Sequence, residues 1–459
     1  MAVGLAAALP SPAGAARVCV TQGGPALDSP LSGGAVGWVA IRGGQEVPYD
    51  TYTGGSKCQF TILVLPISES PTRYPVRIVG GEYRGLLVSD RTRVPGLVSI
   101  PDIEATVRAL EGDEKPAITS RPEPNADEAF RELDVRLTQI HESARFAYWI
   151  LAAAVAAFAL TGLALRSQLW GRAALLAAPV AMATALALSA FELARPRTVA
   201  LVLLAAVALG APLLAALTSR ERLFGVALLA IFAVYAFAFL VSSETVSLAV
   251  IGPHPEGGGR FYGFTNLMET LLLAPALVGG ALLGRRALIP AGFFVLVIVG
   301  SSRLGADGGG VLVFAAGFAF LWLRLRQVRM TMRTLALVAA GAVAFGLALI
   351  GLDAALGGAS HVTRALEDGP GGLAGDVAHR WSVSAHGLVA STSAVLLISA
   401  GAAVLVWVAL RRPRYATVDA VLVALAVSLL VNDSPRDVIV WGALTCTALR
   451  MWKDVRHVE

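Results

Sequence analysis

Residues 146–165 have the sequence FAYWILAAAVAAFALTGLAL, which contains no charged side chain. A helix needs about 20 such residues to cross the hydrocarbon core of a bilayer. The run is followed at 166–172 by RSQLWGR, a short segment with two arginines, and then by a second apolar run. Apolar runs alternating with short arginine-bearing loops predict a polytopic α-helical membrane protein.

Similar apolar runs recur through the rest of the chain. Seven are long enough to span a bilayer, at 146–165, 173–193, 198–217, 223–241, 265–283, 334–352 and 388–410. Four are shorter, at 287–300, 308–323, 416–431 and 437–452. The shorter runs form two adjacent pairs, so they are either complete spans or broken, re-entrant helices. Together the runs predict a membrane domain at 146–452 with about eleven transmembrane helices, some short or broken.

Charge divides the chain before the first span. Of the 459 residues, 56% are apolar and 15% charged, whereas soluble domains carry about 25% charge. The first sixteen residues hold no charge, and residues 17–145 hold 31 charged side chains. This predicts a secretory signal peptide at 1–16, a small α/β module at 17–125, a charged juxtamembrane helix at 126–145 and a polar tail at 453–459. The net charge of +5 is explained by basic loops, so no nucleic acid partner is expected.

The leader and the cysteines bear on the compartment of the module. Ala13-Gly14-Ala15 is a small-x-small cleavage signal, although a disordered terminus rich in Ala and Pro is the alternative. In an exported module Cys19 and Cys58 either form a disulfide or remain two unpaired side chains. Cys446 lies in the last apolar run and is expected in the membrane core.

Short apolar runs between Gly and Pro residues predict strands in the module, at 37–42, 59–66, 75–79 and 85–89. A short helix is expected at 103–110 with Asp102 as its N-cap, and a Pro-rich linker at 118–125. Residues 127–145 have helical periodicity and are expected to continue into the first span.

The basic residues predict the orientation. With the module outside and eleven spans, the inner loops hold Arg166, Arg172, Arg220, Arg222, Arg285, Arg286, Arg324, Arg326, Arg329, Arg333, Arg411, Arg412, Arg414, Arg450, Lys453 and Arg456. The outer loops hold Arg195, Arg197, Arg260, Arg303, Arg364, Arg380 and Arg436. The excess on one side predicts a plasma-membrane protein with an extracytoplasmic module and a cytoplasmic C-terminus.

Four polar motifs fall at the outer ends of the predicted spans. They are GGGRFYGFTNLME at 257–269, SSRLGADGGG at 301–310, DVAHRWSVSAH at 376–386 and NDSPRD at 432–437. Their candidate ligand-binding residues are Arg260, Tyr262, Asn266, Arg303, Arg380 and Asn432, and their candidate catalytic residues are Glu269, Asp307 and Asp433. Arginines suit an anionic headgroup and carboxylates suit a base or a hydroxyl-binding group.

Each motif also has a purely structural interpretation. Arg260 can extend from an interfacial loop towards the membrane surface, and Arg303 and Asp307 can form a structural ion pair. Arg380 with its neighbouring histidines can cap a span, and residues 432–437 can form a turn with Asx hydrogen bonds. The chain contains no Walker-type loop and no recognised zinc or cofactor motif, so no nucleotide, metal or cofactor is expected.

Residues 85–112, GLLVSDRTRVPGLVSIPDIEATVRALEG, resemble the closing strand and helix of alkaline-phosphatase-superfamily domains. The motifs GRFYGFTNLME at 259–269, SRLGADGGG at 302–310 and LVNDS at 430–434 are similar to those of bacterial cell-envelope proteins that fuse such a domain to a multi-span region. Phe264-Thr265 and Pro435 depart from that pattern. The resemblance implies an envelope protein whose module is a trimmed phosphatase relative.

The module lacks the ligands that such a phosphatase needs. Residues 17–145 contain a single histidine, His141 in the charged juxtamembrane helix, so a two-metal site is not expected, although Thr51, Thr53 or Ser56 could be a surviving nucleophile. Three functions follow as alternatives. The chain handles a lipid-linked or phosphate-bearing envelope intermediate, such as a polyprenyl-linked one, by binding, translocation or transfer. The second alternative is a transporter or channel that uses Glu269 and Asp307. The third is a non-catalytic envelope scaffold.

The predicted topology can be tested with reporter fusions. Fusions after Glu142 and within 252–259 should report an extracytoplasmic position, because an even number of spans separates them. Fusions after Arg286, Arg333 and Arg412 should report a cytoplasmic position. A cytoplasmic signal at residue 255 would overturn both the orientation and the outward-facing site.

Overall fold

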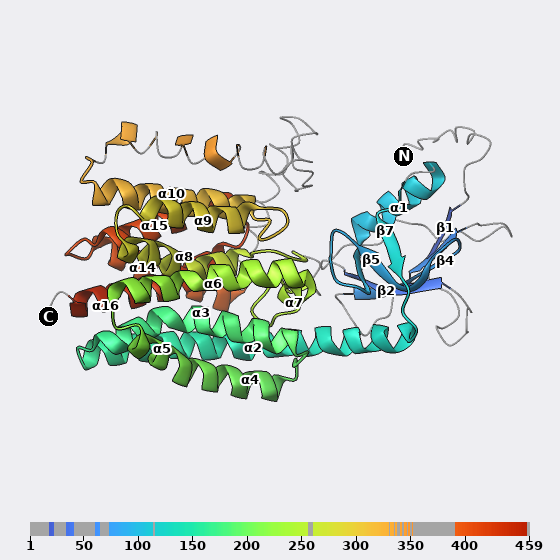
Figure 1. Cartoon of the computed structure of the whole chain (residues 1–459), viewed down its shortest axis with the longest axis horizontal. Helices are drawn as coiled ribbons and strands as arrows, with labels where there is room; N and C mark the ends of the chain where they lie inside the picture. The colour runs from blue at the N-terminus through green and yellow to red at the C-terminus, as the bar shows by residue number, and fades with distance from the viewer. Residues whose placement is uncertain are drawn as a thin grey trace. The chain divides into compact units, whose positions relative to one another are not determined.

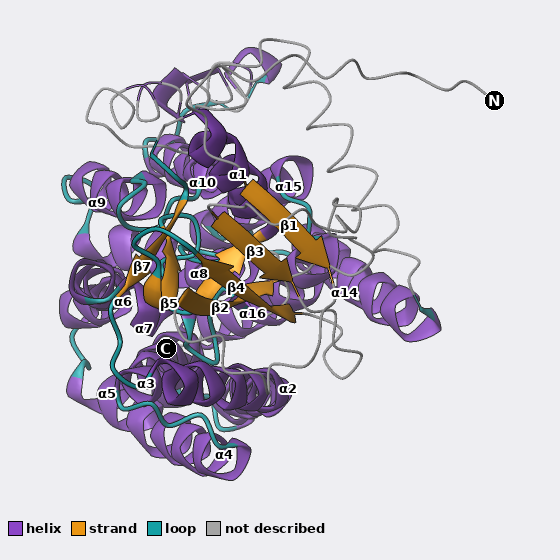
Figure 2. Ribbon diagram, turned by 90° about the vertical axis from the view of Figure 1, so that its right-hand side faces the viewer, coloured by secondary structure: helices purple, strands orange, loops and turns teal. Residues whose placement is uncertain are grey.

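The computed structural model describes residues 18–22, 34–40, 60–64, 73–112, 115–255, 260–329 and 391–456, with parts of 331–351. The chain forms two compact units, one of Met1–Thr138 with His254–Phe261 and one of Gln139–Pro253 with Tyr262–Glu459. The strands belong to the first unit, and the second is built from helices (Figures 1 and 2). The expected signal peptide, Cys58, residues 51–56, most of 334–352 and residues 376–386 lie outside the described residues.

The first unit contains a seven-stranded sheet in the described part of the chain. Its strands are β1 (Val18–Gln22), β2 (Gly34–Ala40), β3 (Phe60–Val64), β4 (Arg73–Val79), β5 (Arg84–Ser89), β6 (Leu97–Ser99) and β7 (Ile118–Arg121). The order is β1-β3-β4-β2-β5-β7, with β6 paired to β2 beyond the end of β5. Parallel and antiparallel pairs are mixed, since β2 is antiparallel to β4 but parallel to β5.

The four predicted strands are confirmed, with ends shifted by a few residues. The expected linker at 118–125 is wrong for its first half, because β7 pairs antiparallel with β5. The buried Tyr83 side chain reinforces this edge by donating a hydrogen bond to the Ile118 carbonyl at 2.7 Å. Burial raises the pKa of the Tyr83 hydroxyl to about 12, so the neutral, donating form is present at physiological pH.

Helix α1 (Ile100–Gly112) begins earlier than predicted, so Asp102 lies in its first turn rather than at its N-cap. The buried Asp102 carboxylate accepts hydrogen bonds from the hydroxyls of Ser89 (2.8 Å) and Ser99 (2.6 Å). Its other oxygen accepts from Nε of Arg91 at 2.8 Å. Asp102 therefore joins β5, β6 and the start of α1 through one charge-assisted network.

The sheet is joined to the start of α2 (Ala126–Ala164), the helix that contains the charged segment and the first apolar run. Trp38 of β2 stacks on Phe130 with ring centroids 4.4 Å apart and donates its indole N–H to the Phe130 carbonyl at 3.1 Å. The buried Arg73 of β4 binds the Asp134 carboxylate and donates to the Thr138 hydroxyl at 2.6 Å. These contacts explain why residues 126–138 belong to the same unit as the sheet.

The second unit is a bundle of helices that run side by side (Figure 1). After α2 come α3 (Gln168–Ala190), α4 (Pro196–Ala205), the π-helical turn η1 (Ala206–Gly210), α5 (Ala211–Leu217), α6 (Glu221–Val241) and α7 (Ser243–Ser247). They are followed by α8 (Asn266–Leu283), α9 (Leu288–Gly300), α10 (Gly308–Leu325), α14 (Thr392–Leu410), α15 (Ala416–Val431) and α16 (Pro435–Arg456).

Seven helices in the described part are long and apolar enough to cross a membrane. They are Ala126–Ala164, Gln168–Ala190, Pro196–Leu217, Glu221–Val241, Asn266–Leu283, Gly308–Leu325 and Thr392–Leu410. Large apolar side chains are exposed on their outer faces, such as Leu209 and Phe237, and such surfaces require a lipid environment. The chain is thus a polytopic helical membrane protein, whereas the count of about eleven spans stays a prediction.

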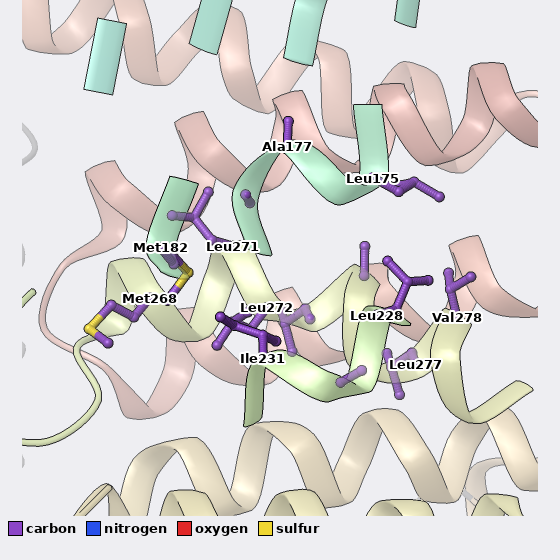
Figure 3. Packing of buried hydrophobic residues seen from close by; sticks show 14 of the residues in the cluster. Leu175, Ala177, Met182, Leu228, Ile231, Met268, Leu271, Leu272, Leu277 and Val278 are labelled. Atoms are coloured by element: carbon purple, nitrogen blue, oxygen red, sulfur yellow. The ribbon is translucent and has the colours of Figure 1, made fainter. Parts of the chain in front are cut away.

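Helix α8 lies at the centre of the bundle. All of its residues from Leu267 to Gly280 are buried, and α3, α6, α9, α10, α15 and α16 pack around it. Figure 3 shows Leu271 and Leu272 of α8 among Met182 of α3 and Ile231 of α6. A polar side chain on α8 therefore meets other helices rather than solvent.

Because neighbouring helices alternate in direction, the bundle has two chemically different ends. Helices α8, α10 and α16 begin at one end, which we call the polar end. The arginine-bearing turns around 166–172, 218–222 and 411–415 lie at the other, which we call the basic end. Most basic loop residues therefore lie at one end of the bundle, as their positions in the sequence predicted.

Replacing the Asp102 carboxylate tests the network in the first unit. Asp102→Ala should destabilise this unit by about 3–5 kcal/mol, because Arg91 and two hydroxyls lose a buried acceptor. Limited proteolysis of the full chain should then show faster cleavage before residue 126. Glu104→Ala is the matched control, since Glu104 is exposed and pairs only loosely with Arg108 at 3.7 Å. Cleavage of the two variants at the same rate would contradict the role of Asp102 in stabilising the first unit.

Candidate functional site

Three helices begin close together at the polar end, and their first residues carry polar side chains. Helix α8 begins at Asn266, α10 at Gly308 and α16 at Pro435, while α15 ends at Val431. Side chains from these segments form what we call the polar cluster. Its members are Asn266, Glu269, Asp307, Ser428, Asn432, Asp433 and Ser434.

Glu269 is completely buried one turn inside α8. Its Oε2 accepts a hydrogen bond from the Asn432 amide at 3.1 Å, and the same amide nitrogen donates to the Ser428 hydroxyl at 2.8 Å. Asn432 can reach both groups because it follows directly after α15, one turn beyond Ser428. The Asn432 side chain thus joins α8 to the end of α15.

A second set of hydrogen bonds joins α8 to the turn before α16. The Asn266 amide donates to the Asp433 carboxylate at 2.9 Å and to the Ser434 hydroxyl at 3.2 Å. Ser434 also donates to Asp433 at 3.2 Å. Asn266 and Glu269 lie three residues apart on one helical face, so both reach the segment 432–434.

Asp307 precedes α10 and is 1% exposed. The glycines after it allow the close approach of Asn432. A Cβ on Gly309 would lie 2.6 Å from Oδ1 of Asn432 and 3.6 Å from Oδ1 of Asp307. The Asn432 side chain therefore faces Glu269 through its nitrogen and the start of α10 through its oxygen.

The loops before α8 and α10 are held together by backbone contacts. The Phe264 amide donates to the Gly305 carbonyl at 2.8 Å, and Gly263 has a φ of +88°. A Cβ on Gly263 would lie 2.1 Å from that carbonyl oxygen, so only glycine fits there. Phe264 is buried among aromatic rings of α6, which fixes the loop before α8.

Helix polarity favours the two buried carboxylates. Glu269 lies in the first turn of α8 and Asp307 directly precedes α10, where partial positive charge from backbone amides is concentrated. Thr265 caps α8 by accepting a hydrogen bond from the Met268 amide at 3.3 Å. Among the described residues, no three His, Cys, Asp or Glu side chains are grouped as a metal site would require.

The structure brings together five of the nine residues that the sequence singled out. Asn266, Glu269, Asp307, Asn432 and Asp433 lie in or beside the hydrogen-bonded cluster.

The other four candidates are placed differently. Arg303 is exposed in the turn between α9 and α10, whereas Asp307 is buried. Tyr262 is half-buried ahead of α8, Arg260 belongs to the first unit, and Arg380 lies outside the described residues.

Sequence reasoning missed Ser428, Ser434 and the contact between Gly309 and Asn432. Ser428 is a lone hydroxyl within an apolar run, and its one signal is its spacing of four residues from Asn432. Ser434 belongs to the quoted motif at 432–437 but was not singled out. Gly309 was one of three adjacent glycines, and its contact with Asn432 depends on a segment far away in sequence.

The basic end also contains acids that the sequence interpretation overlooked. Asp419 binds Arg324 at 3.1 Å and Arg414 at 3.0 Å. Asp454 likewise binds Arg450 at 3.1 Å and Arg411 at 3.4 Å. These pairs join α10, α14, α15 and α16, so several of the loop arginines stabilise the bundle.

Comparison of the chain with protein-family models, with curated proteins and with solved structures finds no match in any of the three.

Filling the space at Gly309 tests the contact with Asn432. Gly309→Ala should destabilise the protein by about 1–3 kcal/mol, because the new methyl group overlaps Oδ1 of Asn432. Thermal unfolding in detergent measures the loss. Gly210→Ala is the control, since a Cβ there would be 3.6 Å from its nearest neighbour in Val180. In an Asn432→Ala background the cost of Gly309→Ala should shrink; an unchanged cost would mean that the two positions are not in contact.

Proposed function

We propose that this chain is an integral membrane protein of a bacterial cell envelope that binds a phosphate-bearing, lipid-linked envelope intermediate at the polar cluster. The observation that carries the proposal is the convergence of three segments that lie far apart in sequence, namely Asn266 to Glu269, Asp307 to Gly309 and Asn432 to Ser434. Two buried carboxylates among them are costly in a membrane bundle, and such residues usually mark a functional site.

The chemistry around the cluster suits an anionic headgroup that also carries hydroxyl groups. Three helices present their amino ends here, and Arg303 lies exposed in the adjoining turn. Arg260 and Arg380 stay sequence-based candidates for the same role, since Arg260 belongs to the first unit and Arg380 lies outside the described residues. Carboxylates and amides such as Glu269, Asp433 and Asn266 bind hydroxyl groups well, and Glu269 or Asp433 would act as the base if the intermediate is transferred.

The proposed orientation follows from the distribution of arginines and lysines. Sixteen basic residues belong to loops assigned to the inside and seven to loops assigned to the outside. By the positive-inside rule, the polar end is then extracytoplasmic, together with the first unit. A lipid-linked intermediate would reach the cluster from the outer leaflet of the plasma membrane.

The relationship to phosphatase-like envelope proteins belongs to the same proposal. The strand, strand and helix formed by β5, β6 and α1 are compatible with the resemblance of residues 85–112 to the closing part of that domain. In this view the first unit is a trimmed relative that serves as a binding or structural cap.

A transporter or channel is the second candidate, and one observation favours it. Glu269 and Asp307 are almost completely buried and both lie near Asn432, an arrangement that also suits a proton or small cation. The polar groups of the cluster lie at one end of the bundle rather than along its length. A conduction path would need them deeper, so headgroup binding is the better-supported function.

Measuring lipid-linked intermediates in cells with and without the gene separates the two functions. Loss of the chain should change the amount of one phosphate-bearing lipid intermediate, resolved by mass spectrometry of extracted lipids. Glu269→Gln and Asn432→Ala should reproduce most of that change, whereas Arg326→Ala at the basic end should not. An unchanged lipid pool, combined with altered proton or cation flux in vesicles, would instead establish transport.

A further inference from the structure

A group of cations surrounds two aromatic rings at the basic end of the bundle. Phe224 of α6 and Trp452 of α16 are both buried, with ring centroids 5.7 Å apart. The Arg172 guanidinium stands 5.2 Å from the Phe224 ring, and Nζ of Lys453 stands 4.7 Å from the Trp452 ring. The Arg456 guanidinium is 5.7 Å from the same Trp452 ring.

Ion pairs at this end of the bundle each hold two cations for one acid. Asp419 and Asp454 each lie between two arginines and neutralise part of their charge. In the described part of the chain, Glu221 forms an ion pair with Arg456, next to Lys453. Lys453 and Arg456 together therefore carry one more charge than Glu221 offsets, beside the Trp452 ring.

Arg172 is held in place by hydrogen bonds to a neighbouring helix, and the Trp452 ring is held by packing. Arg172 donates to the backbone carbonyls of Thr218, at 3.0 Å, and Ser219, which end α5. Gly171 packs directly on the Trp452 ring, since a Cβ there would lie 2.7 Å from it. A site built from three helices and held in this way is ordered before any ligand binds.

The surface next to the cations is apolar. Leu217 at the end of α5 and Leu223 at the start of α6 are 68% and 49% exposed, and Leu213 and Val226 continue this surface along the helices. Lipid acyl chains are the natural cover for such side chains in a membrane protein. A ligand that joins a phosphate group to acyl chains matches both parts of the surface.

We propose that Arg172, Lys453 and Arg456 form a binding site for the phosphate headgroup of an anionic phospholipid, whose acyl chains lie along α5 and α6. Basic pockets between membrane helices commonly hold such headgroups, and tryptophan is common at the same depth. Arg456 uses one nitrogen for Glu221. A guanidinium has further N–H donors, and such donors suit bidentate binding of phosphate. The site lies at the end opposite the polar cluster and does not depend on the proposed function.

Native mass spectrometry of the full chain in detergent tests the proposal with dioleoyl phosphatidylglycerol as the probe. Phosphatidylglycerol should bind more tightly than dioleoyl phosphatidylcholine. Lys453→Gln together with Arg456→Gln should weaken phosphatidylglycerol binding by about thirtyfold, since each cation near the membrane surface contributes about 1 kcal/mol. Lys453→Gln alone, which leaves the Arg456–Glu221 pair intact, should weaken it about fivefold.

The matched control removes the same charge from the same end. Arg285 and Arg286 are exposed in the turn between α8 and α9, so Arg285→Gln with Arg286→Gln should leave phosphatidylglycerol binding unchanged. Equal losses in both double variants would show nonspecific attraction and overturn the proposal. Unchanged binding in Lys453→Gln, or displacement of the lipid by millimolar inorganic phosphate, would also overturn it, the latter by indicating a soluble phosphate site.

Discussion

A carboxylate enclosed by apolar helices needs hydrogen-bond donors from its neighbours, and Glu269 meets this need through the amide of Asn432. Much of the polar end follows from this bond. Helix α15 must end at Val431 so that Asn432 can turn towards α8, and α10 must begin with glycine so that its backbone can approach Asn432. Because α8 is surrounded by six other helices, the position of Glu269 also restricts how those helices pack.

The sequence predicted the spans well because an apolar run of membrane length has few other uses. It also predicted that Asn266, Glu269, Asp307 and Asn432 would share one end of the bundle, because each interrupts an apolar run at a place that alternating spans put on the same side. Side-chain pairing was harder to foresee. Arg303 and Asp307 suggested an ion pair by proximity in sequence, yet the turn at 301–307 leaves Arg303 exposed and buries Asp307.

What the sequence could not predict depends on contacts between distant segments. The start of α1 moved from residue 103 to Ile100 because Ser89 and Ser99 bind Asp102 within the first turn. Residues 118–121 form a strand because the edge of β5 is available to pair with them, although prolines follow directly. Ser428 joined the polar cluster because Asn432 turns back over it. None of these partners is encoded in local periodicity or composition.

Helix polarity explains the positions of many charged side chains at both ends of the bundle. The charged side chains with the opposite sign need another explanation. Acids near the amino ends of α8 and α10, and Lys453 and Arg456 in the last turn of α16, each oppose the partial charge of their helix. Arg436, in the first turn of α16, has the unfavourable sign for an amino end, at about 0.3–1 kcal/mol. Its side chain is exposed. A binding partner that brings negative charge to the polar end would convert this cost into attraction, and this is one reason why we propose an anionic headgroup rather than a cation there.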